Sequence, residues 1–171
     1  MTGKESGLTL LELLVVIAIT AILSSISMPY FNGILSEIRS LSTGHSLRTS
    51  LVLARATAVN TRREVRICPS DDSMLCSSTS KWENGWIIYT PKAGKLYREP
   101  DDNLIQASGK RLGVKITKNG HESTIKFSAS GRIGLNRSLT VCTLPGKQPL
   151  FRLVLYRTGR IRMDYSQVDC G

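Results

Sequence analysis

The sequence predicts an α+β fold in which a long N-terminal helix packs against an antiparallel β-sheet. Residues 8–60 combine a hydrophobic run with a later stripe of apolar residues at helical spacing. After Thr61 the spacing changes, and short runs rich in β-branched and aromatic residues alternate with turn-forming stretches. The 171 residues have room for one modest globular domain in addition to a hydrophobic segment.

The hydrophobic run occupies residues 8–28 and reads LTLLELLVVIAITAILSSISM, in which Glu12 is the charged residue. A helix of ~20 apolar residues is long enough to span a bilayer. In an ordinary secretory signal the small residue of the cleavage site follows a shorter apolar core. Here the small residue Gly7 precedes the run, so cleavage after Gly7 would leave the hydrophobic helix in the mature protein.

The second half of the predicted helix is amphipathic. Pro29 lacks an amide donor and predicts a bend, and residues 43–44 predict a second weak point. An apolar stripe recurs every three or four residues and predicts a face that packs on the sheet. The stripe consists of Leu41, Gly44, Leu47, Leu51, Ala54 and Ala58, and four arginines fall mostly outside it, Arg39, Arg48, Arg55 and Arg62.

Six short runs predict the strands, at residues 64–68, 85–90, 114–117, 124–127, 139–142 and 151–157. In the last run apolar and other residues alternate, as in a strand with one buried face. Trp82, Trp86 and Tyr89 could offer stacking faces to nucleic-acid bases. Their place in a strand-like run favours packing in the core instead.

Four cysteines, Cys68, Cys76, Cys142 and Cys170, allow three pairings. An even number behind a membrane-targeting segment favours disulfides in an oxidising compartment. We expect Cys68 and Cys76 to close a short loop, and Cys142 and Cys170 to fix the C-terminal tail to the domain, each bond contributing ~2–4 kcal/mol. Four free thiols are the alternative. The cysteines lack C-x-x-C spacing and the two histidines lie far apart, so we expect no metal site.

Nearly all of the net charge of +10 lies in the last third of the chain. Residues 109–171 contain 12 Lys and Arg against three acidic residues, a net of +9, whereas residues 1–108 contain 11 against 10, a net of +1. A solvated basic surface fits this distribution. A surface that binds a polyanion, either nucleic acid or anionic lipid, fits it equally well.

Gly7, Leu8, Glu12 and Pro29 together resemble the N-terminus of the type IV pilin and pseudopilin family. The resemblance implies that a prepilin peptidase cuts after Gly7 and that Leu8, which stands where phenylalanine is commonest, becomes the methylated N-terminus. Glu12 and Pro29 then occupy the family's positions 5 and 22 of the mature chain.

The resemblance also implies a domain organisation. Residues 1–7 are a cleaved leader, residues 8–30 a transmembrane and filament-core helix, and residues 31–171 a periplasmic or extracellular domain with the pilin fold. A carboxylate within a membrane span is costly and is usually retained for a reason. If helices of successive subunits are staggered, Glu12 of one can pair with the Leu8 amine of the next. The alternative is that Glu12 marks the edge of an ordinary single-span anchor.

Three further segments resemble the GspH/FimT branch of this family: ARATAVNTRREVRICPSDD at residues 54–72, WENGWIIYT at 82–90 and FSASGRIG at 127–134. Members of this branch are minor subunits of type IV pili or of type II secretion pseudopili. The resemblance implies other pilin subunits and the prepilin peptidase as partners. It also implies a single-pass location in the inner membrane before assembly, and in the pilus or at the cell surface afterwards.

Residues Gly159, Arg160, Ile161 and Arg162 fit the G-R-x-R motif of DNA-binding FimT-type minor pilins. Gly159 permits a tight turn after a strand. In an extended chain Arg160 and Arg162 then project to one side, where two guanidinium groups suit bidentate contacts to the phosphates of double-stranded DNA. Further candidate contacts are Arg132, Arg137, Lys147, Arg152 and Arg157. The alternative is a solvated basic hairpin without a ligand.

The chain has no nucleophile elbow, P-loop or dinucleotide-binding motif, so we expect neither an enzyme nor a cofactor. The pairs at residues 71–72 and 101–102 lack the spacing of a calcium loop and indicate turns. Two functions remain: a minor pilin that binds incoming DNA during natural transformation, and a structural minor pilin or type II secretion pseudopilin without a DNA role. A membrane-anchored sensor or enzyme is the third, and it requires that residues 1–7 stay in the mature protein.

Overall fold

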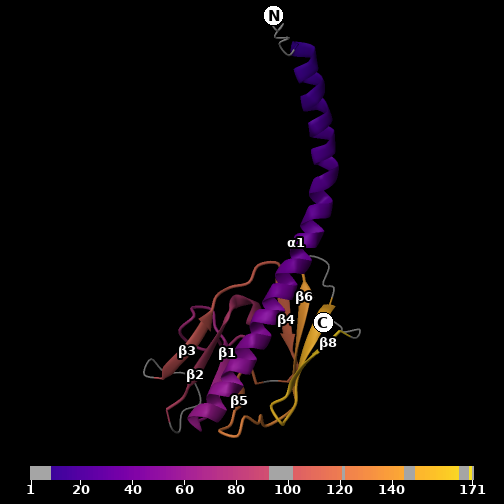
Figure 1. The fold of residues 1–171 in the computed structure, drawn as a ribbon. Helices are drawn as coiled ribbons and strands as arrows, with labels where there is room; N and C mark the ends of the chain where they lie inside the picture. Colours follow the sequence, from indigo (N-terminus) through magenta and orange to yellow (C-terminus); the bar gives the residue numbers. More distant parts are fainter. Residues whose placement is uncertain (1–8, 93–101, 121, 145–148, 166–169, 171) are drawn as a thin grey trace, which may run out of the picture. The chain divides into compact units, whose positions relative to one another are not determined.

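The computed structural model describes residues 9–92, 102–120, 122–144, 149–165 and 170, and for residues 26–32, 149 and 150 it describes the backbone alone. The chain divides into two compact units, Met1–Leu35 and Ser36–Gly171. One helix, α1 (Leu10–Thr61), contributes residues to both units (Figure 1). All the strands belong to the second unit.

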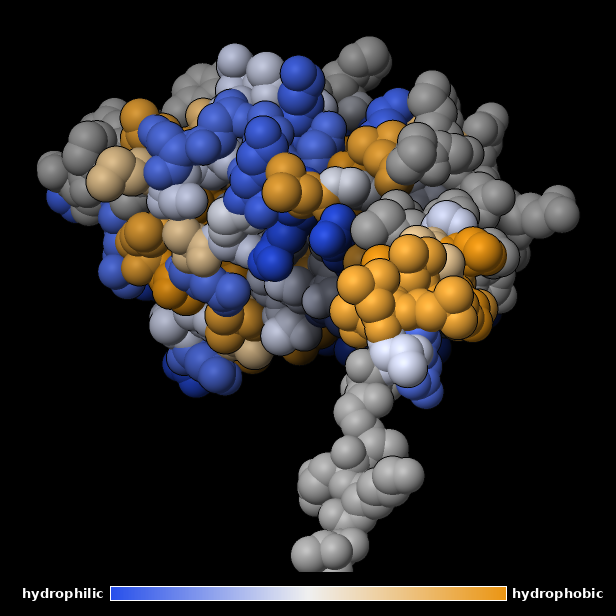
Figure 2. Space-filling view, turned by 90° about the horizontal axis from the view of Figure 1, so that it is seen from above, coloured by the Kyte–Doolittle hydropathy of each residue, from blue (hydrophilic) through white to orange (hydrophobic). Residues whose placement is uncertain are grey.

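In the first unit the large apolar side chains of α1 are exposed, from Leu10 to Leu23. Figure 2, seen from above, shows hydrophobic surface where α1 faces the viewer. The hydroxyls of Thr20 and Ser24 donate hydrogen bonds to carbonyl oxygens one turn earlier in the helix, so these polar groups are satisfied without a partner chain. Within the ranges given above, no helix is long and apolar enough to cross a membrane.

Helix α1 continues through residues 43 and 44, where the sequence predicted a weak point within the helix. Gly44 is buried, and a methyl group at its Cα would collide with the ring of Phe151. The missing side chain therefore makes room for an aromatic ring of the core. We infer that this packing outweighs the cost of a glycine in a helix, which is ~1 kcal/mol.

Two four-stranded antiparallel sheets follow, where the sequence suggested one. The first has the order β3-β2-β1-β5 and consists of β1 (Val65–Pro69), β2 (Trp86–Thr90), β3 (Asn103–Ser108) and β5 (Ile125–Phe127). The second has the order β4-β6-β7-β8 and consists of β4 (Val114–Lys118), β6 (Arg137–Thr143), β7 (Pro149–Leu155) and β8 (Ile161–Asp164). A short 3-10 helix, η1 (Trp82–Asn84), precedes β2.

Six strands coincide with predicted runs, and β3 and β8 were not predicted as strands. Both are edge strands, and neither contains a fully buried apolar residue. Strand β3 is largely exposed and therefore leaves no strong apolar alternation in the sequence. Strand β8 alternates Ile161 and Met163 with polar residues, but its four residues are too few for a clear pattern. Strand β8 directly follows the turn that was predicted after residue 157.

The apolar stripe of α1 packs against β-sheet, as predicted, and it contacts both sheets. Leu47, Leu51, Ala54 and Ala58 are fully buried and belong to one core cluster with residues of β1, β5, β6 and β7. The indole Nε1 of Trp86 donates a hydrogen bond of 2.9 Å to Ser50 Oγ of the helix. Trp82, Trp86 and Tyr89 are fully buried, which confirms that they are core residues.

Two disulfides join Cys68 to Cys76 and Cys142 to Cys170, the pairs that the sequence favours. Both disulfides and the complete described core cluster lie within residues 36–171. We therefore expect this unit to fold without residues 1–35.

The loop that the Cys68–Cys76 disulfide closes is organised by Asp72. Its Oδ1 accepts hydrogen bonds of 2.8 Å from the amides of Met74 and Leu75. These amide hydrogen bonds, with Leu75 as the larger contributor, hold the pKa of Asp72 below its ordinary value. Asp72 is thus a turn residue, as the sequence indicated, whereas residue 101 lies outside the described residues.

Candidate nucleic-acid interface

The turn between β7 and β8 is built around Gly159. The amide of Gly159 donates to the carbonyl oxygen of Tyr156 over 2.7 Å, and the amide of Tyr156 donates to the carbonyl oxygen of Arg160 over 2.9 Å. Gly159 has φ = +79°, a conformation that favours glycine. A side chain here would also collide with the carbonyl oxygen of Gly131. Two independent constraints therefore require glycine at this position.

A second loop, residues 128–136, lies against this turn. The amide of Ile133 donates to the carbonyl oxygen of Arg157 over 3.1 Å, and the amide of Arg157 donates to Asn136 Oδ1 over 2.8 Å. The loop is closed on itself by a hydrogen bond of 2.9 Å from the Ser128 amide to the Arg132 carbonyl oxygen. The loop thus brings the exposed Arg132 close to the β7–β8 turn, which carries the exposed Arg157.

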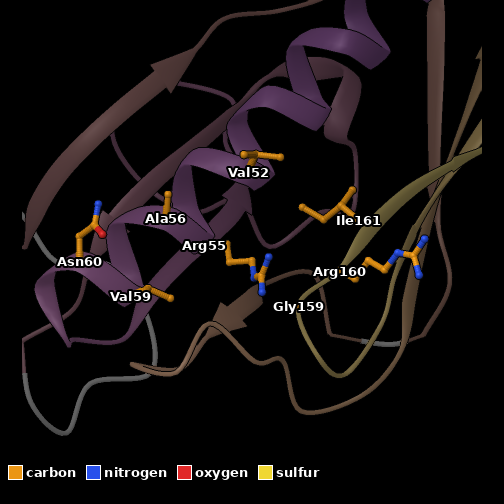
Figure 3. Close-up of a pocket in the computed structure, with 8 residues that line it drawn as sticks. All are labelled: Val52, Arg55, Ala56, Val59, Asn60, Gly159, Arg160 and Ile161. Carbon is orange, nitrogen blue, oxygen red and sulfur yellow. The ribbon is translucent and has the colours of Figure 1, made fainter.

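Arg55 of α1 connects the helix to both loops, although it was not predicted as a site residue. Its Nε donates to the Gly131 carbonyl oxygen over 3.2 Å and its Nη2 to the Thr158 carbonyl oxygen over 3.5 Å. Figure 3 shows the Arg55 side chain reaching from α1 toward Gly159. Backbone carbonyl acceptors carry no residue-specific signal, so these contacts could not have been found in the sequence.

A groove of about 440 Å³ separates α1 from the β7–β8 turn, lined by Val52, Arg55, Ala56, Val59, Asn60, Gly159, Arg160 and Ile161. Ile161 is partly buried and packs against the core, opposite Leu155 in the strand pair. Arg160 and Arg162 are exposed. In Figure 3 the guanidinium group of Arg160 points away from α1. The turn therefore keeps its apolar residue inside and presents its arginines to solvent.

Comparison with known proteins gives the family. Residues 43–159 match the family model described as "Type II transport protein GspH", and residues 2–28 match the prokaryotic N-terminal methylation motif. The chain belongs to the GspH family. It is thus a minor type IV pilin or type II pseudopilin of the GspH type, which assembles with other pilin subunits. No protein among the curated sequences matches it.

Solved structures share the fold of this GspH-family chain. The type IV minor pilin FimU of Pseudomonas aeruginosa is 20% identical, with a TM-score of 0.59 over 77% of this chain and 99% of FimU. The minor pseudopilin EpsH of Vibrio cholerae is 12% identical, with a TM-score of 0.53 over 73% of this chain and 95% of EpsH. E. coli GspH is 17% identical, with a TM-score of 0.52 over 75% of this chain and 89% of GspH.

The residues predicted for N-terminal processing and filament assembly in this GspH-family chain are only partly described. Gly7 and Leu8 lie outside the described residues, and at Pro29 the backbone is helical. Glu12 is exposed in the first turn of α1, and its amide donates to Thr9 Oγ1 over 3.3 Å. Thr9 therefore caps the helix, and a carboxylate in the first turn is favourable to the helix dipole.

The remaining predicted DNA contacts are dispersed. Arg137 is half-buried on β6, and its Nη2 lies 3.4 Å from Glu122 Oε2, so an anion would compete with a carboxylate there. Arg152 is half-buried on β7, opposite Asp164 of β8 in the strand pair. Lys147 lies outside the described residues. The structure therefore brings together Arg132, Arg157 and Arg160, and it adds Arg55. Arg162 lies two residues after Arg160, in strand β8.

Proposed function

We propose that this protein is a minor type IV pilin that binds double-stranded DNA without sequence specificity through residues 159–162, for DNA uptake in natural transformation. The observation that carries the proposal is the exposure of Arg160, on a turn that hydrogen bonds hold in place, and of Arg162, in the strand β8 that follows. Neither guanidinium group forms an ion pair with a carboxylate in the described part of the chain. Both are therefore available to phosphate oxygens.

The surroundings of the turn support the proposal. Arg157 is exposed on the same turn and Arg132 on the adjoining loop, and the last third of the chain carries a net charge of +9. The ties from Arg55 to both loops reduce the conformational entropy that binding would otherwise cost. Contacts to phosphates carry no sequence information, and each neutralised phosphate releases counterions. Binding should therefore be insensitive to sequence and strongly weakened by salt.

In this proposal the N-terminal residues direct the subunit into the filament. A prepilin peptidase cleaves after Gly7, Leu8 becomes the methylated N-terminus, and residues 8–30 anchor the subunit in the inner membrane with residues 31–171 in the periplasm. The match of residues 2–28 to the methylation motif supports this processing. On assembly, Glu12 pairs with the Leu8 amine of a neighbouring subunit, and Pro29 bends the filament-core helix. Filament retraction then draws the captured DNA toward the cell envelope.

The second candidate is a structural pseudopilin of a type II secretion system without a DNA role. The description of the matching family model as a type II transport protein favours it. A gene deletion separates the two candidates: loss of secretion or piliation with normal DNA uptake supports the structural role, whereas loss of uptake supports the DNA-binding role.

The direct experiment is a gel-shift titration of residues 36–171 with duplex DNA at several salt concentrations, using Arg160→Gln and Arg162→Gln. We expect each substitution to weaken binding about tenfold, because a hydrogen-bonded charge contact is lost. The slope of log K against log salt should fall by about one for each lost phosphate contact. Lys81→Gln removes an exposed cation at η1 and is the matched control.

Two results would contradict DNA binding. One is a fragment that shows no salt-dependent shift although circular dichroism and thermal melting show that it is folded. The other is an equal loss of affinity for Arg160→Gln, Arg162→Gln and Lys81→Gln, because this would indicate a diffuse attraction between a basic protein and a polyanion.

A further inference from the structure

A second basic groove lies apart from the β7–β8 turn, and neither the family match nor the proposed DNA contacts account for it. It encloses about 450 Å³ between α1 and the connection from β3 to β4. Its lining consists of Ile38, Arg39, Ser42 and Thr43 of the helix with Lys110, Arg111 and Leu112 of the connection. Three cations and two hydroxyl groups thus meet in one depression.

Arg111 is fixed in this groove. Its Nη2 donates hydrogen bonds to Ser108 Oγ over 2.7 Å and to Ser46 Oγ over 3.2 Å. The guanidinium carbon lies 5.3 Å from the ring centroid of Trp86, a fully buried residue. A guanidinium group held by two hydroxyls and an aromatic ring loses little entropy when it binds an anion.

The cations of the groove are not ion-paired within the described residues, although the carboxylate of Asp71 lines a neighbouring depression together with Lys110. Within the described part of the chain, Arg39, Lys110 and Arg111 form no ion pair with a carboxylate. The nearest acidic residue in the helix sequence, Glu37, precedes Ile38 by one position. At about 100° per residue, Glu37 lies on nearly the opposite side of α1 from the centre of the groove. The groove therefore suits an anionic group such as a phosphate.

Two large apolar side chains, both more than half exposed, line the same groove. Leu112 is 69% exposed and Ile38 is 55% exposed. Exposed apolar residues beside clustered cations are typical of surfaces that enter the headgroup region of an anionic bilayer, where apolar burial and charge attraction act together. A DNA backbone would leave Leu112 and Ile38 in contact with water.

The chain sequence keeps the groove near a bilayer whenever residues 8–30 are inserted. Ile38 follows residue 30 by eight positions, and each residue extends the chain by at most about 3.5 Å. The helical part of the groove therefore stays within about 30 Å of the end of the hydrophobic run, whatever the arrangement of the two units.

We propose that this groove binds the phosphate of an anionic phospholipid headgroup while Leu112 and Ile38 enter the interface, so that the unassembled subunit holds residues 36–171 on the membrane surface. The proposal rests on the membrane anchor described under the proposed function, and it is independent of DNA binding. Entry of the subunit into a filament then requires release of this contact.

Vesicle binding by residues 36–171, preceded by a neutral tag, tests the surface directly. The vesicles contain phosphatidylcholine alone or with phosphatidylglycerol. We expect binding only to the anionic vesicles, weakened about fivefold by Lys110→Gln, since a cation near an anionic surface has about this effect. Leu112→Ser should weaken binding about threefold or more by removing apolar burial. Both side chains are exposed, so neither variant should affect folding.

Arg48→Gln is the matched control, because Arg48 is exposed on α1 about half a turn around the helix from Arg39. Equal losses for Arg48→Gln and Lys110→Gln overturn the proposal, since they would indicate unspecific charge attraction. Retained binding by Leu112→Ser overturns it as well. Competition by inorganic phosphate at concentrations equal to those of the lipid phosphate would assign the groove to a free anion. Weakened DNA binding by Lys110→Gln with unchanged vesicle binding would make it part of the nucleic-acid interface.

A second measurement uses the full chain in nanodiscs. Hydrogen exchange of the segment around Lys110 and Leu112 should be slower in discs that contain phosphatidylglycerol than in discs of phosphatidylcholine alone. Equal exchange in the two kinds of disc overturns the proposal, even if the gel-shift experiment shows DNA binding. Slower exchange supports it, even if DNA binding is absent.

Discussion

Arg55 of α1 donates a hydrogen bond of 3.2 Å from Nε to the carbonyl oxygen of Gly131, 76 residues later in the chain. A hydrogen bond from the same guanidinium group to the Thr158 carbonyl oxygen joins the β7–β8 turn to this contact. One side chain of the helix thereby positions two loops that carry arginines of the candidate interface.

We expect Arg55→Lys to weaken DNA binding about threefold although the charge is unchanged. Lysine has a single ammonium group and cannot reproduce the two-armed contact to separate carbonyl oxygens. Hydrogen exchange of residues 128–133 should become faster in the same variant. Affinity and exchange equal to those of the unchanged protein would show that Arg55 contributes charge alone, and Arg48→Lys serves as the control for the substitution itself.

The sequence predicted those helices and strands in which burial of one face makes apolar residues recur at regular spacing. The stripe that contains Leu47, Leu51 and Ala54 was predicted because one face of α1 is buried along its whole contact with the sheets. Strand β3 was missed because an exposed edge strand needs no apolar alternation. The packing role of Gly44 was not predicted because its partner, Phe151, follows more than 100 residues later in the chain.

Of the candidate interface, the motif was predicted and the residues that hold it in place were not. The motif at residues 159–162 is local, and its glycine and arginines are visible in the sequence. The partners of the turn are backbone groups, such as the Gly131 carbonyl oxygen, and side chains such as Asn136 that have no distinctive spacing. These partners are determined by the packing of α1 against two loops, which no local pattern encodes.

Gly159→Ala should destabilise residues 36–171 by at least about 2 kcal/mol. A non-glycine residue in the left-handed region costs ~1–2 kcal/mol, and the added methyl group collides with the Gly131 carbonyl oxygen. Denaturant unfolding measures the loss. Gly134→Ala is the matched control, because no atom lies within 4 Å of a methyl group there and its φ is not positive. Similar losses for the two variants would show that the turn does not depend on the conformation of Gly159.

Gly44→Ala should also destabilise the domain, although alanine favours helices by ~1 kcal/mol over glycine. The added methyl group would lie where the ring of Phe151 packs, and backbone and ring are both held in the core. In a double-mutant cycle, Phe151→Leu should offset part of this loss, since the smaller side chain leaves room for the methyl group. Additive effects of the two substitutions would mean that the glycine and the ring do not constrain each other.

The stability of the disulfide-closed loop at residues 68–76 should depend on pH through Asp72. Amide hydrogen bonds from Leu75 and Met74 lower the pKa of Asp72 in the folded protein, so the ionised carboxylate is the form that folding favours. Its contribution is therefore complete above the ordinary pKa of an aspartate, about 4, and is lost as the pH falls through the lower folded pKa. Asp71 acts in the same direction, since hydrogen bonds from Ser77 and Asn84 lower its pKa as well.

Asp72→Asn isolates this contribution, because asparagine keeps an acceptor oxygen and does not titrate. Hydrogen exchange of the Met74 and Leu75 amides should be faster in the variant at pH 7, and the difference should shrink as the pH falls below about 4. A local measurement is needed because Asp72 is exposed and solvent screens its effect on global unfolding. The difference in exchange between the unchanged protein and the variant could instead stay constant down to pH values below about 3. The charge of Asp72 would then be irrelevant, and the loop would depend on the oxygen acceptor and the disulfide alone.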